Sequence, residues 1–422
     1  MYWQNLENKT IGIWGSGKEG NAAKTAILQH VVQKEIIDIS EDNLDDIYRC
    51  QVVVKSPGVS LYRGEIVKAK GEGVKFTSSS NLFFANRAKD TNIVAITGTK
   101  GKSTTSSLLA HTLKELGIEV ELAGNIGRPL VELVDTKAKW VIAEMSSYQC
   151  ADLAYGADIG VLLNLYPEHL QWHGSHERYY ADKINMLVQA ELKVLNTSDE
   201  RSQKITHFDD AIYFNDTNAI HINDGYFYDG QNKLFATSFL PLLGEHNAQN
   251  ACAVLTVIKA MGLNVKNCEK AFATFKGLKH RLDIIGEYNG ITFVDDSIST
   301  TPETAIAALK ALDKGQYLTL LAGGFDRGQD YKGLAEYTSS IKDRCTIITL
   351  PDTGVRVSAE ADKYGIKTIA VANMTEAVEQ AFRITPQGGA VILSPAAPSY
   401  NCYKNFEERG EDFANCVKSL AK

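Results

Sequence analysis

The chain has 422 residues, of which 44% are hydrophobic and 23% charged, and this composition is typical of a globular protein and excludes a disordered or fibrous one. Its formal net charge of −7 disfavours a general affinity for nucleic acid, and no run approaches the ~20 apolar residues that a membrane-spanning helix needs. The seven cysteines form no Cys-x-x-Cys pair, and the first ten residues carry no signal pattern. These features predict a cytoplasmic protein with reduced thiols and without a nucleic-acid or membrane partner.

Short β-rich runs alternate with helical patterns along the whole chain. This alternation is typical of α/β proteins, in which parallel strands are joined by crossover helices. The length favours three domains. We expect a Rossmann-like N-terminal domain at 1–90, a central P-loop ATPase-like domain with a parallel sheet at 91–279, and a Rossmann-like C-terminal domain at 280–422.

The first glycine-rich turn, Gly15 to Gly20, reads GSGKEG, follows a predicted strand and opens a predicted helix. Asp38 lies 23 positions beyond Gly15, at the end of the next strand. Taken alone, this pattern predicts a dinucleotide site. Three interpretations remain open at this point, namely an NAD site, a site for a nucleotide-type substrate, and a purely structural turn. The second is favoured, because the chain also carries an ATP-type loop that a dehydrogenase would not need.

That second loop lies in the stretch NIVAITGTKGKSTTSSLLAHTLKELG, at 92–117. A β-rich run, a Gly-Thr-Lys-Gly-Lys-Ser-Thr turn and an amphipathic helix make a phosphate cradle, in which Lys102 contacts phosphate and Ser103 or Thr104 reaches Mg²⁺. The usual pattern has a glycine five residues before the Gly-Lys pair, where this chain has Ile96. The competing interpretation, a simple helix cap, does not account for two lysines interleaved with two glycines.

Further polar side chains follow predicted strands. Glu144 ends one strand in AEMSSYQ, and Glu168 and His169 follow another in NLYPEHLQWHG. A carboxylate and an imidazole beside a triphosphate site fit Mg²⁺ ligands or their supports. The residues alone predict that Lys183, in HERYYADKINM, is a solvated helix lysine.

The motifs TGTKGKST, AEMSSYQ, NLYPEHL, HERYYADK, GEHNAQN, LKHR, DDSISTTP, AGGFDRGQD and LSPAAPSY…KNFEERG occur in this order. Together they resemble the Mur ligase family nearly end to end, and the shortened loop GTKGKST is that family's own variant. The resemblance implies an ATP-dependent amide-bond ligase of peptidoglycan precursor synthesis, with ATP and Mg²⁺ as cofactors. Within the family it implies the branch whose substrates are UDP-N-acetylmuramoyl-L-alanine and glutamate, joined through an acyl phosphate by a monomeric enzyme.

The resemblance also implies a role for individual residues. Catalytic roles fall to Lys102, His169 and Lys183. The residues implied at ATP are Gly98, Thr99, Lys100, Gly101, Lys102, Ser103, Thr104, Asn247, Asn250, Arg281 and Asp296. Those implied at the UDP-sugar are Gly15, Ser16, Gly17, Lys18, Ser56, Pro57, Gly58 and Asn125, and those at glutamate are Arg327, Ser399 and Phe406. The implied metal ligands are Ser103, Glu144, His169 and Lys183, the last as a carbamate.

Three positions depart from the common form of the branch that adds D-glutamate. Ile298 and Arg327 each stand where lysine is usual, and the C-terminal motif reads SPAAPSY. Arginine grips a carboxylate with a planar fork, so the exchange is not neutral. The expected substrate is D-glutamate, and the alternatives are an L-glutamate-adding variant and, with less support, a folylpolyglutamate-synthase-like ligase. The latter enzymes lack a unit equivalent to 1–90. The sequence DIS after the second strand also lacks the arginine expected near the uridine.

Overall fold

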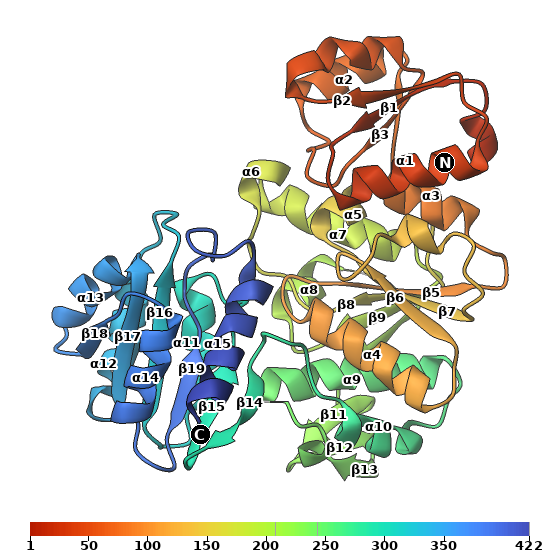
Figure 1. The fold of residues 1–422 in the computed structure, drawn as a ribbon. Coiled ribbons are helices and arrows are strands. Elements are labelled where there is room, and N and C mark those ends of the chain that lie inside the picture. The colour runs from red at the N-terminus through yellow and green to blue at the C-terminus, as the bar shows by residue number, and fades with distance from the viewer. Residues whose placement is uncertain (207, 243, 422) are drawn as a thin grey trace. The chain divides into compact units, whose positions relative to one another are not determined.

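The computed structural model describes residues 1–206, 208–242 and 244–421. The chain forms two compact units, one of Met1–Leu240 with His246–Phe275 and the other of Pro241–Glu245 with Lys276–Lys422. Figure 1 colours the first unit red to green and most of the second teal to blue. Among the helices of the described residues, none is long and apolar enough to cross a membrane.

The first unit contains a four-stranded parallel sheet in the order β2-β1-β3-β4. The elements of this part of the chain are η1 (Trp3–Asn5), β1 (Thr10–Trp14), α1 (Lys18–His30), β2 (Glu35–Ile39), η2 (Glu41–Arg49), β3 (Val52–Lys55), α2 (Gly64–Gly71), β4 (Lys75–Ser78) and α3 (Ser79–Asn86). The chain continues from β1 to β2 on one side, and β3 lies on the other side of β1. The loops after β1 and β3 therefore meet at a switch point, where sheets of this kind bind ligands.

A nine-stranded sheet, in the order β13-β12-β11-β10-β9-β8-β5-β7-β6, completes the first unit. It is parallel from β6 to β11, and β12 and β13 add an antiparallel edge. Its strands are β5 (Asn92–Thr97), β6 (Val120–Gly124), β7 (Trp140–Glu144), β8 (Ile159–Leu162), β9 (Leu192–Asn196), β10 (Ala211–Phe214), β11 (Ile220–Asn223), β12 (Tyr226–Asp229) and β13 (Asn232–Ala236).

The helical elements around this sheet are α4 (Lys102–Glu115), η3 (Leu130–Leu133), α5 (Ser147–Ala151), α6 (Leu170–His173), α7 (His176–Gln189), α8 (Glu200–Ile205), η4 (Thr237–Phe239), α9 (Glu245–Ala260), η5 (Val265–Asn267) and α10 (Cys268–Thr274). Helices α4 and α7 cover opposite faces of the sheet (Figure 1). Ile93 and Ala95 of β5 share a buried core with Met186 and Leu187 of α7. The loops after β5, β7 and β8 consequently emerge at one edge, because these strands are parallel neighbours.

The second unit is built on a six-stranded sheet in the order β14-β15-β19-β16-β17-β18, in which only β14 is antiparallel to its neighbour. Its elements are β14 (Asp283–Tyr288), β15 (Ile291–Asp295), α11 (Pro302–Leu312), β16 (Leu318–Gly324), α12 (Lys332–Ser339), η6 (Lys342–Arg344), β17 (Cys345–Asp352), α13 (Gly354–Asp362), β18 (Lys367–Ala370), α14 (Met374–Ile384), β19 (Ala390–Leu393) and α15 (Phe406–Leu420). Buried hydrophobic cores of aliphatic and aromatic side chains fill both faces of this sheet.

The α/β class and the parallel sheets agree with the sequence analysis. The described chain has three separate sheets, which lie within the expected ranges 1–90, 91–279 and 280–422. The boundaries between these ranges stay a prediction.

Candidate active site

The loop after β5 has the geometry of a phosphate cradle. Gly98 has φ 157° and Gly101 has φ 85°, and α4 begins at Lys102. A Cβ atom on Gly101 would lie 2.8 Å from the side-chain amide of Asn250. Only glycine therefore fits this position, and Asn250, expected at ATP, lies directly against the loop. The first amides of α4 have no partner within the helix, and a helix N-terminus after a glycine-rich loop is a place where anions commonly bind.

Lys102 folds back over this loop. Its Nζ donates to the carbonyl oxygens of Gly98 and Thr99, each at 3.0 Å. The ammonium thus lies above the backbone that would hold the phosphates. The phosphate-contacting role expected of Lys102 from the sequence stays a prediction.

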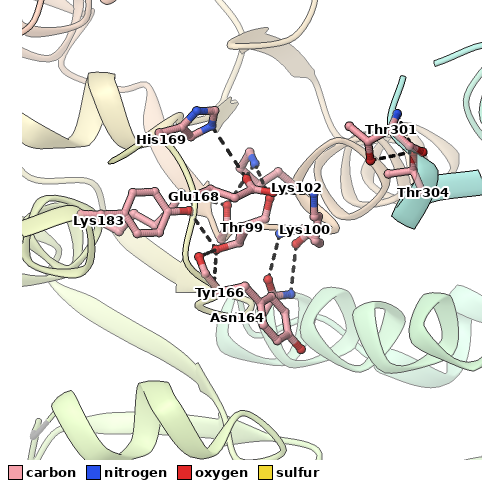
Figure 2. A network of polar contacts seen from close by, with 12 residues as sticks. Thr99, Lys100, Lys102, Asn164, Tyr166, Glu168, His169, Lys183, Thr301 and Thr304 are labelled. Atoms are coloured by element: carbon pink, nitrogen blue, oxygen red, sulfur yellow. Dashed lines mark hydrogen bonds and ion pairs between the residues drawn. The ribbon is translucent and has the colours of Figure 1, made fainter. Parts of the chain in front are cut away.

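The loop after β8 is hydrogen-bonded to the cradle (Figure 2). Lys100 N donates to Asn164 Oδ1 at 2.8 Å, and Lys100 Nζ lies 2.6 Å from Glu168 Oε1. Thr99 Oγ1 lies 2.9 Å from the hydroxyl of Tyr179 and accepts from the amide of Tyr166 at 2.9 Å. These contacts hold the segment that carries Glu168 and His169 beside the cradle.

Glu144 ends β7 with only 1% of its surface exposed. Its carboxylate accepts from Asn125 Nδ2 at 2.6 Å and from Ser106 Oγ of α4 at 3.5 Å. A buried carboxylate facing the first turns of α4 fits a Mg²⁺ ligand at the phosphates. Asn125, expected at the UDP-sugar, is placed against this carboxylate.

Lys183 contradicts the prediction of a solvated lysine. It is 2% exposed, and its Nζ donates to Gly98 O at 2.9 Å. Burial, with a smaller effect from the charge of Lys102, lowers its pKa to about 7. The buried residues of α7 are Tyr179, Asp182, Lys183, Met186 and Leu187, which form one helical face. The spacing of Tyr179, Met186 and Leu187 is the signal that could have predicted the burial.

His169 begins a short helical segment with a left-handed backbone, φ 55°. Its side chain is 48% exposed, and its Nε2 lies 3.8 Å from Glu168 Oε2. Partial burial lowers its pKa, so the ring is neutral at pH 7 and can offer a nitrogen to a metal.

The two loops expected at the UDP-sugar lie together. Ser56 Oγ donates to Gly15 O at 3.3 Å, and Gly15 has φ 110°. A Cβ atom on Gly20 would overlap Gly15 O, so helix α1 approaches the turn closely. Asp38, the acidic residue of the NAD interpretation, is paired with Lys24 at 2.6 Å.

A cavity of about 690 Å³ lies next to these loops. It is lined by Gly58 and Arg63 from the loops after β3, and by Tyr148, Glu168 and His169 from the loops after β7 and β8. Two residues assigned to different roles by sequence, Gly58 and His169, therefore share one cavity. Ser16, Gly17 and Lys18 are exposed and do not line it.

Asn247 is buried on α9 in the first unit, and the second unit holds Arg281, Asp296, Arg327, Ser399 and Phe406. Asp296 is 2% exposed and accepts from Ser394 Oγ at 2.7 Å, and burial raises its pKa to about 6. Ser399 is buried, whereas Arg327 is exposed with its guanidinium 5.5 Å from the ring centroid of Tyr400. Phe406 is the first residue of α15, and the centroid of its ring lies 6.2 Å from the ring centroid of His280.

Sequence reasoning assigned no role to Arg409. It is 1% exposed and donates to Ser297 Oγ, Ser297 O and Ala397 O at 2.9–3.0 Å. It thereby ties together the loops after β15 and β19, which carry Asp296 and Ser399. The motif KNFEERG contains it, but a charged helix residue gives no sign of its own burial.

Among the residues that the structure describes, no three His, Cys, Asp or Glu side chains are grouped to hold a metal. Of the four expected metal ligands, only Glu144 and His169 are residues of these types. The other two are the Ser103 hydroxyl and a carbamylated Lys183. The cradle, Lys102 and Glu144 have the arrangement that is typical of a P-loop nucleotide-binding enzyme of the α/β class.

Comparison with known proteins specifies the family. Residues 96–258 match the Mur ligase middle domain, and residues 280–397 match the Mur ligase, glutamate ligase domain. A UDP-N-acetylmuramoyl-L-alanine–L-glutamate ligase of Micromonospora sp. is 36% identical, with 100% of this chain and 99% of the relative covered. The enzyme of the same name from Xanthomonas euvesicatoria is 35% identical, with 98% and 96% covered.

Solved structures show the same fold at low identity. The MurF ligase of Thermotoga maritima in complex with ADP has a TM-score of 0.61 and 17% identity, with 99% of this chain and 95% of that chain covered. UDP-N-acetylmuramate-alanine ligase MurC of the same organism has a TM-score of 0.60 and 17% identity, with 97% and 99% covered. The chain belongs to the Mur ligase family. It is accordingly an ATP-dependent acid–amino-acid ligase.

Proposed function

We propose that this ligase joins L-glutamate to UDP-N-acetylmuramoyl-L-alanine in peptidoglycan precursor synthesis, as a cytoplasmic monomer. The observation that carries the proposal is the full-length similarity to relatives that bear this name. These names specify L-glutamate. They therefore favour the L-glutamate-adding variant over the D-glutamate-adding enzyme that was expected from the sequence. They give no support to a folylpolyglutamate-synthase-like activity.

The arrangement of the first unit supports separate places for the UDP-sugar and for the muramoyl-alanine carboxylate. The switch point at Gly15 and Ser56 suits the UDP-sugar, and the cavity lined by Gly58 and His169 leads from it toward the cradle. The muramoyl-alanine carboxylate would lie in this cavity, close to the γ-phosphate of ATP. The second unit, with Arg327, Ser399 and Phe406, would present glutamate.

The proposed reaction has two steps. An oxygen of the alanine carboxylate attacks the γ-phosphorus of ATP, the bond to the β-phosphate oxygen breaks, and an acyl phosphate and ADP result. The free amine of glutamate then attacks the acyl carbon, and the tetrahedral intermediate expels phosphate as the amine loses its proton. Lys102 stabilises the charge on the transferring phosphoryl group, and the loops hold the reactants in line.

The residues present fit Mg²⁺. The buried carboxylate of Glu144 and the hydroxyl of Ser103 are oxygen ligands of the kind this ion prefers, and His169 with a carbamylated Lys183 would hold a second ion. When bound, Mg²⁺ neutralises charge on the phosphates. Carbamylation adds CO₂ to the neutral amine, forms an N–C bond and releases one proton. A buried amine with a pKa of about 7 is about half unprotonated at neutral pH, whereas an ordinary lysine is almost fully protonated there.

The test measures phosphate release with ATP, Mg²⁺ and UDP-N-acetylmuramoyl-L-alanine, comparing L-glutamate with D-glutamate. We expect turnover with L-glutamate and a rate at least about 100-fold lower with D-glutamate, a difference of ~3 kcal/mol in the barrier. Turnover with D-glutamate alone would assign the chain to the other stereochemical branch. Silence with both enantiomers would overturn the proposed acceptor.

The variant Arg327→Lys tests whether Arg327 of the second unit binds glutamate. Arg327→Lys keeps the positive charge but removes the planar fork, so it should raise KM for glutamate several-fold while KM for ATP stays the same. Lys102→Ala, which removes the phosphate-contacting ammonium, should abolish phosphate release with either enantiomer. An unchanged KM for glutamate in Arg327→Lys would remove Arg327 from the proposed glutamate site.

A further inference from the structure

A chain of buried hydrogen bonds crosses the first unit. The Tyr62 hydroxyl donates to Asp182 Oδ1 at 2.6 Å, and Asp182 Oδ2 lies 2.5 Å from His173 Nδ1. His173 Nε2 lies 3.0 Å from Ser147 Oγ. In the tautomer with the proton on Nδ1, His173 donates to the Asp182 carboxylate and accepts from Ser147 Oγ at Nε2. In that tautomer every link in the chain has one defined direction.

The Ser147, His173 and Asp182 side chains have the order of a nucleophilic triad, but burial excludes that role. Their exposures are 3%, 0% and 7%, so no substrate can reach the hydroxyl. Aromatic rings enclose His173, with centroids of Trp172 and Tyr179 at 4.4 and 5.2 Å. A fully satisfied polar network of this kind orients the segments that carry it.

The residues at the ends of the network lie close in sequence to the proposed substrate and metal sites. Tyr62 lies on the segment after β3 that begins with Ser56, at the proposed UDP-sugar site. Asp182 directly precedes Lys183 on α7, and Ser147 begins α5 three residues after Glu144. One network thus joins the substrate-binding segment to α5, which follows Glu144, and to α7, which carries Lys183.

Asp182 is well placed to control Lys183. Neighbouring helix residues project about 100° apart, so anchoring the Asp182 carboxylate at two oxygens fixes the rotation of α7 and hence the direction of the next side chain. Lys183 Nζ must reach Gly98 O, at 2.9 Å, and has little freedom in a buried site. Tyr62 is the one member of the network with a substantially exposed side chain, at 38%. It is therefore the link that movement of its segment would break first.

We propose that Tyr62 is a positioning residue that acts through Asp182 to place Lys183 for carbamylation and metal binding. When the segment that carries Tyr62 packs against α7, the hydrogen bond from Tyr62 to Asp182 forms and holds Lys183 in the position needed for carbamylation. This inference rests on the role of Lys183 in the proposed function.

The test compares Tyr62→Phe with a matched control, Ser60→Ala. Ser60 Oγ donates to Trp172 O of α6 at 2.7 Å and accepts from the amide of Tyr62 at 3.3 Å, so the control removes other hydrogen bonds of the same segment but leaves the bond between the Tyr62 hydroxyl and Asp182 in place. The probe is ¹³C-bicarbonate, and the readout is the ¹³C carbamate signal in NMR of the full chain without substrates. Steady-state kcat and KM are measured alongside.

Tyr62→Phe should need about tenfold more bicarbonate for half-maximal carbamate signal, since it loses a hydrogen bond to a charged group, and kcat should fall in parallel. Asp182→Asn should act in the same direction, because an amide has only one acceptor oxygen and cannot accept from both the Tyr62 hydroxyl and His173 Nδ1. Ser60→Ala should keep the wild-type carbamate signal and change only KM for the UDP-sugar.

A wild-type carbamate signal in Tyr62→Phe would overturn the inference, as would an equal loss in Ser60→Ala, which would assign the effect to docking of the segment in general. A missing signal in the wild-type protein itself would instead overturn the carbamate of the proposed function, and this inference with it. Circular dichroism of each variant confirms that the fold is retained.

Discussion

Burial of the Lys183 amine should destabilise the folded enzyme. An inactive variant with an apolar side chain at this position should therefore be more stable than the wild type. We consider Lys183→Met, which replaces a buried amine by an unbranched apolar side chain of similar length. The Lys183 pKa falls from 10.5 to about 7 on folding. Each unit corresponds to 1.36 kcal/mol, so at pH 7 the burial destabilises the folded state by about 4 kcal/mol.

An opposing effect reduces the gain. The substitution removes the hydrogen bond from Nζ to Gly98 O and leaves that carbonyl without this donor, at a cost of about 1–3 kcal/mol. Lys183→Met should therefore be more stable than the wild type at pH 7 by about 1–3 kcal/mol. Its thermal midpoint should rise by roughly 2–10 °C. Turnover should be lost, because the variant cannot carry a carbamate.

The pH dependence tests the cause. Below pH 7 the lysine is charged in both states, and the destabilisation is complete. As the pH rises from 7 toward 10.5, the unfolded state loses its extra proton and the destabilisation disappears. At pH 9 the advantage of Lys183→Met should be smaller than at pH 7 by about 2 kcal/mol.

The assay is thermal and urea denaturation at pH 7 and pH 9 in buffers freed of CO₂, so that the lysine remains an amine. Lys204→Met is the control, since the Lys204 side chain is 76% exposed and its replacement should change stability by less than about 0.5 kcal/mol at either pH. Added bicarbonate should stabilise the wild type alone. A variant less stable than wild type at pH 7, with the same difference at pH 9, would refute the reasoning.

Other substitutions test the second unit and the metal site. Gly410→Ala should destabilise the fold by about 1–3 kcal/mol, because its Cβ would overlap His280 Nδ1 and lie 2.5 Å from Asp295 Oδ2. Gly333→Ala, a helix position with open space, should instead stabilise by up to about 1 kcal/mol, and equal midpoints for both variants in thermal denaturation would contradict the packing. The hydrogen bond to Asp295 raises the His280 pKa, so its stabilisation is complete below pH 6.5 and is lost as the pH rises through the raised value. His280→Gln should lack this pH dependence in urea denaturation. Glu144→Gln should raise the Mg²⁺ concentration for half-maximal turnover at least about tenfold, and an unchanged value would remove Glu144 from the metal site.

Local patterns in the sequence determined the α/β class and the position of the ATP loop. Gly98 and Gly101 are glycines because the turn has positive φ angles and a close neighbour, and such constraints act within a few residues. The resemblance to the family rests on the same kind of local motif. The three sheets confirm the α/β class and the comparisons confirm the family, whereas the binding of ATP by this loop stays a prediction.

Only the tertiary structure decided the state of Lys183 and the existence of the Tyr62–Asp182 link. A helix pattern indicates which residues share a face, but not that this face packs against the loop after β5 and that burial lowers the pKa of a lysine to about 7. The two ends of the link are 120 positions apart in the chain. Burial and hydrogen-bond partners over such separations arise from packing of the sheets and helices, so they become visible only when the chain is folded.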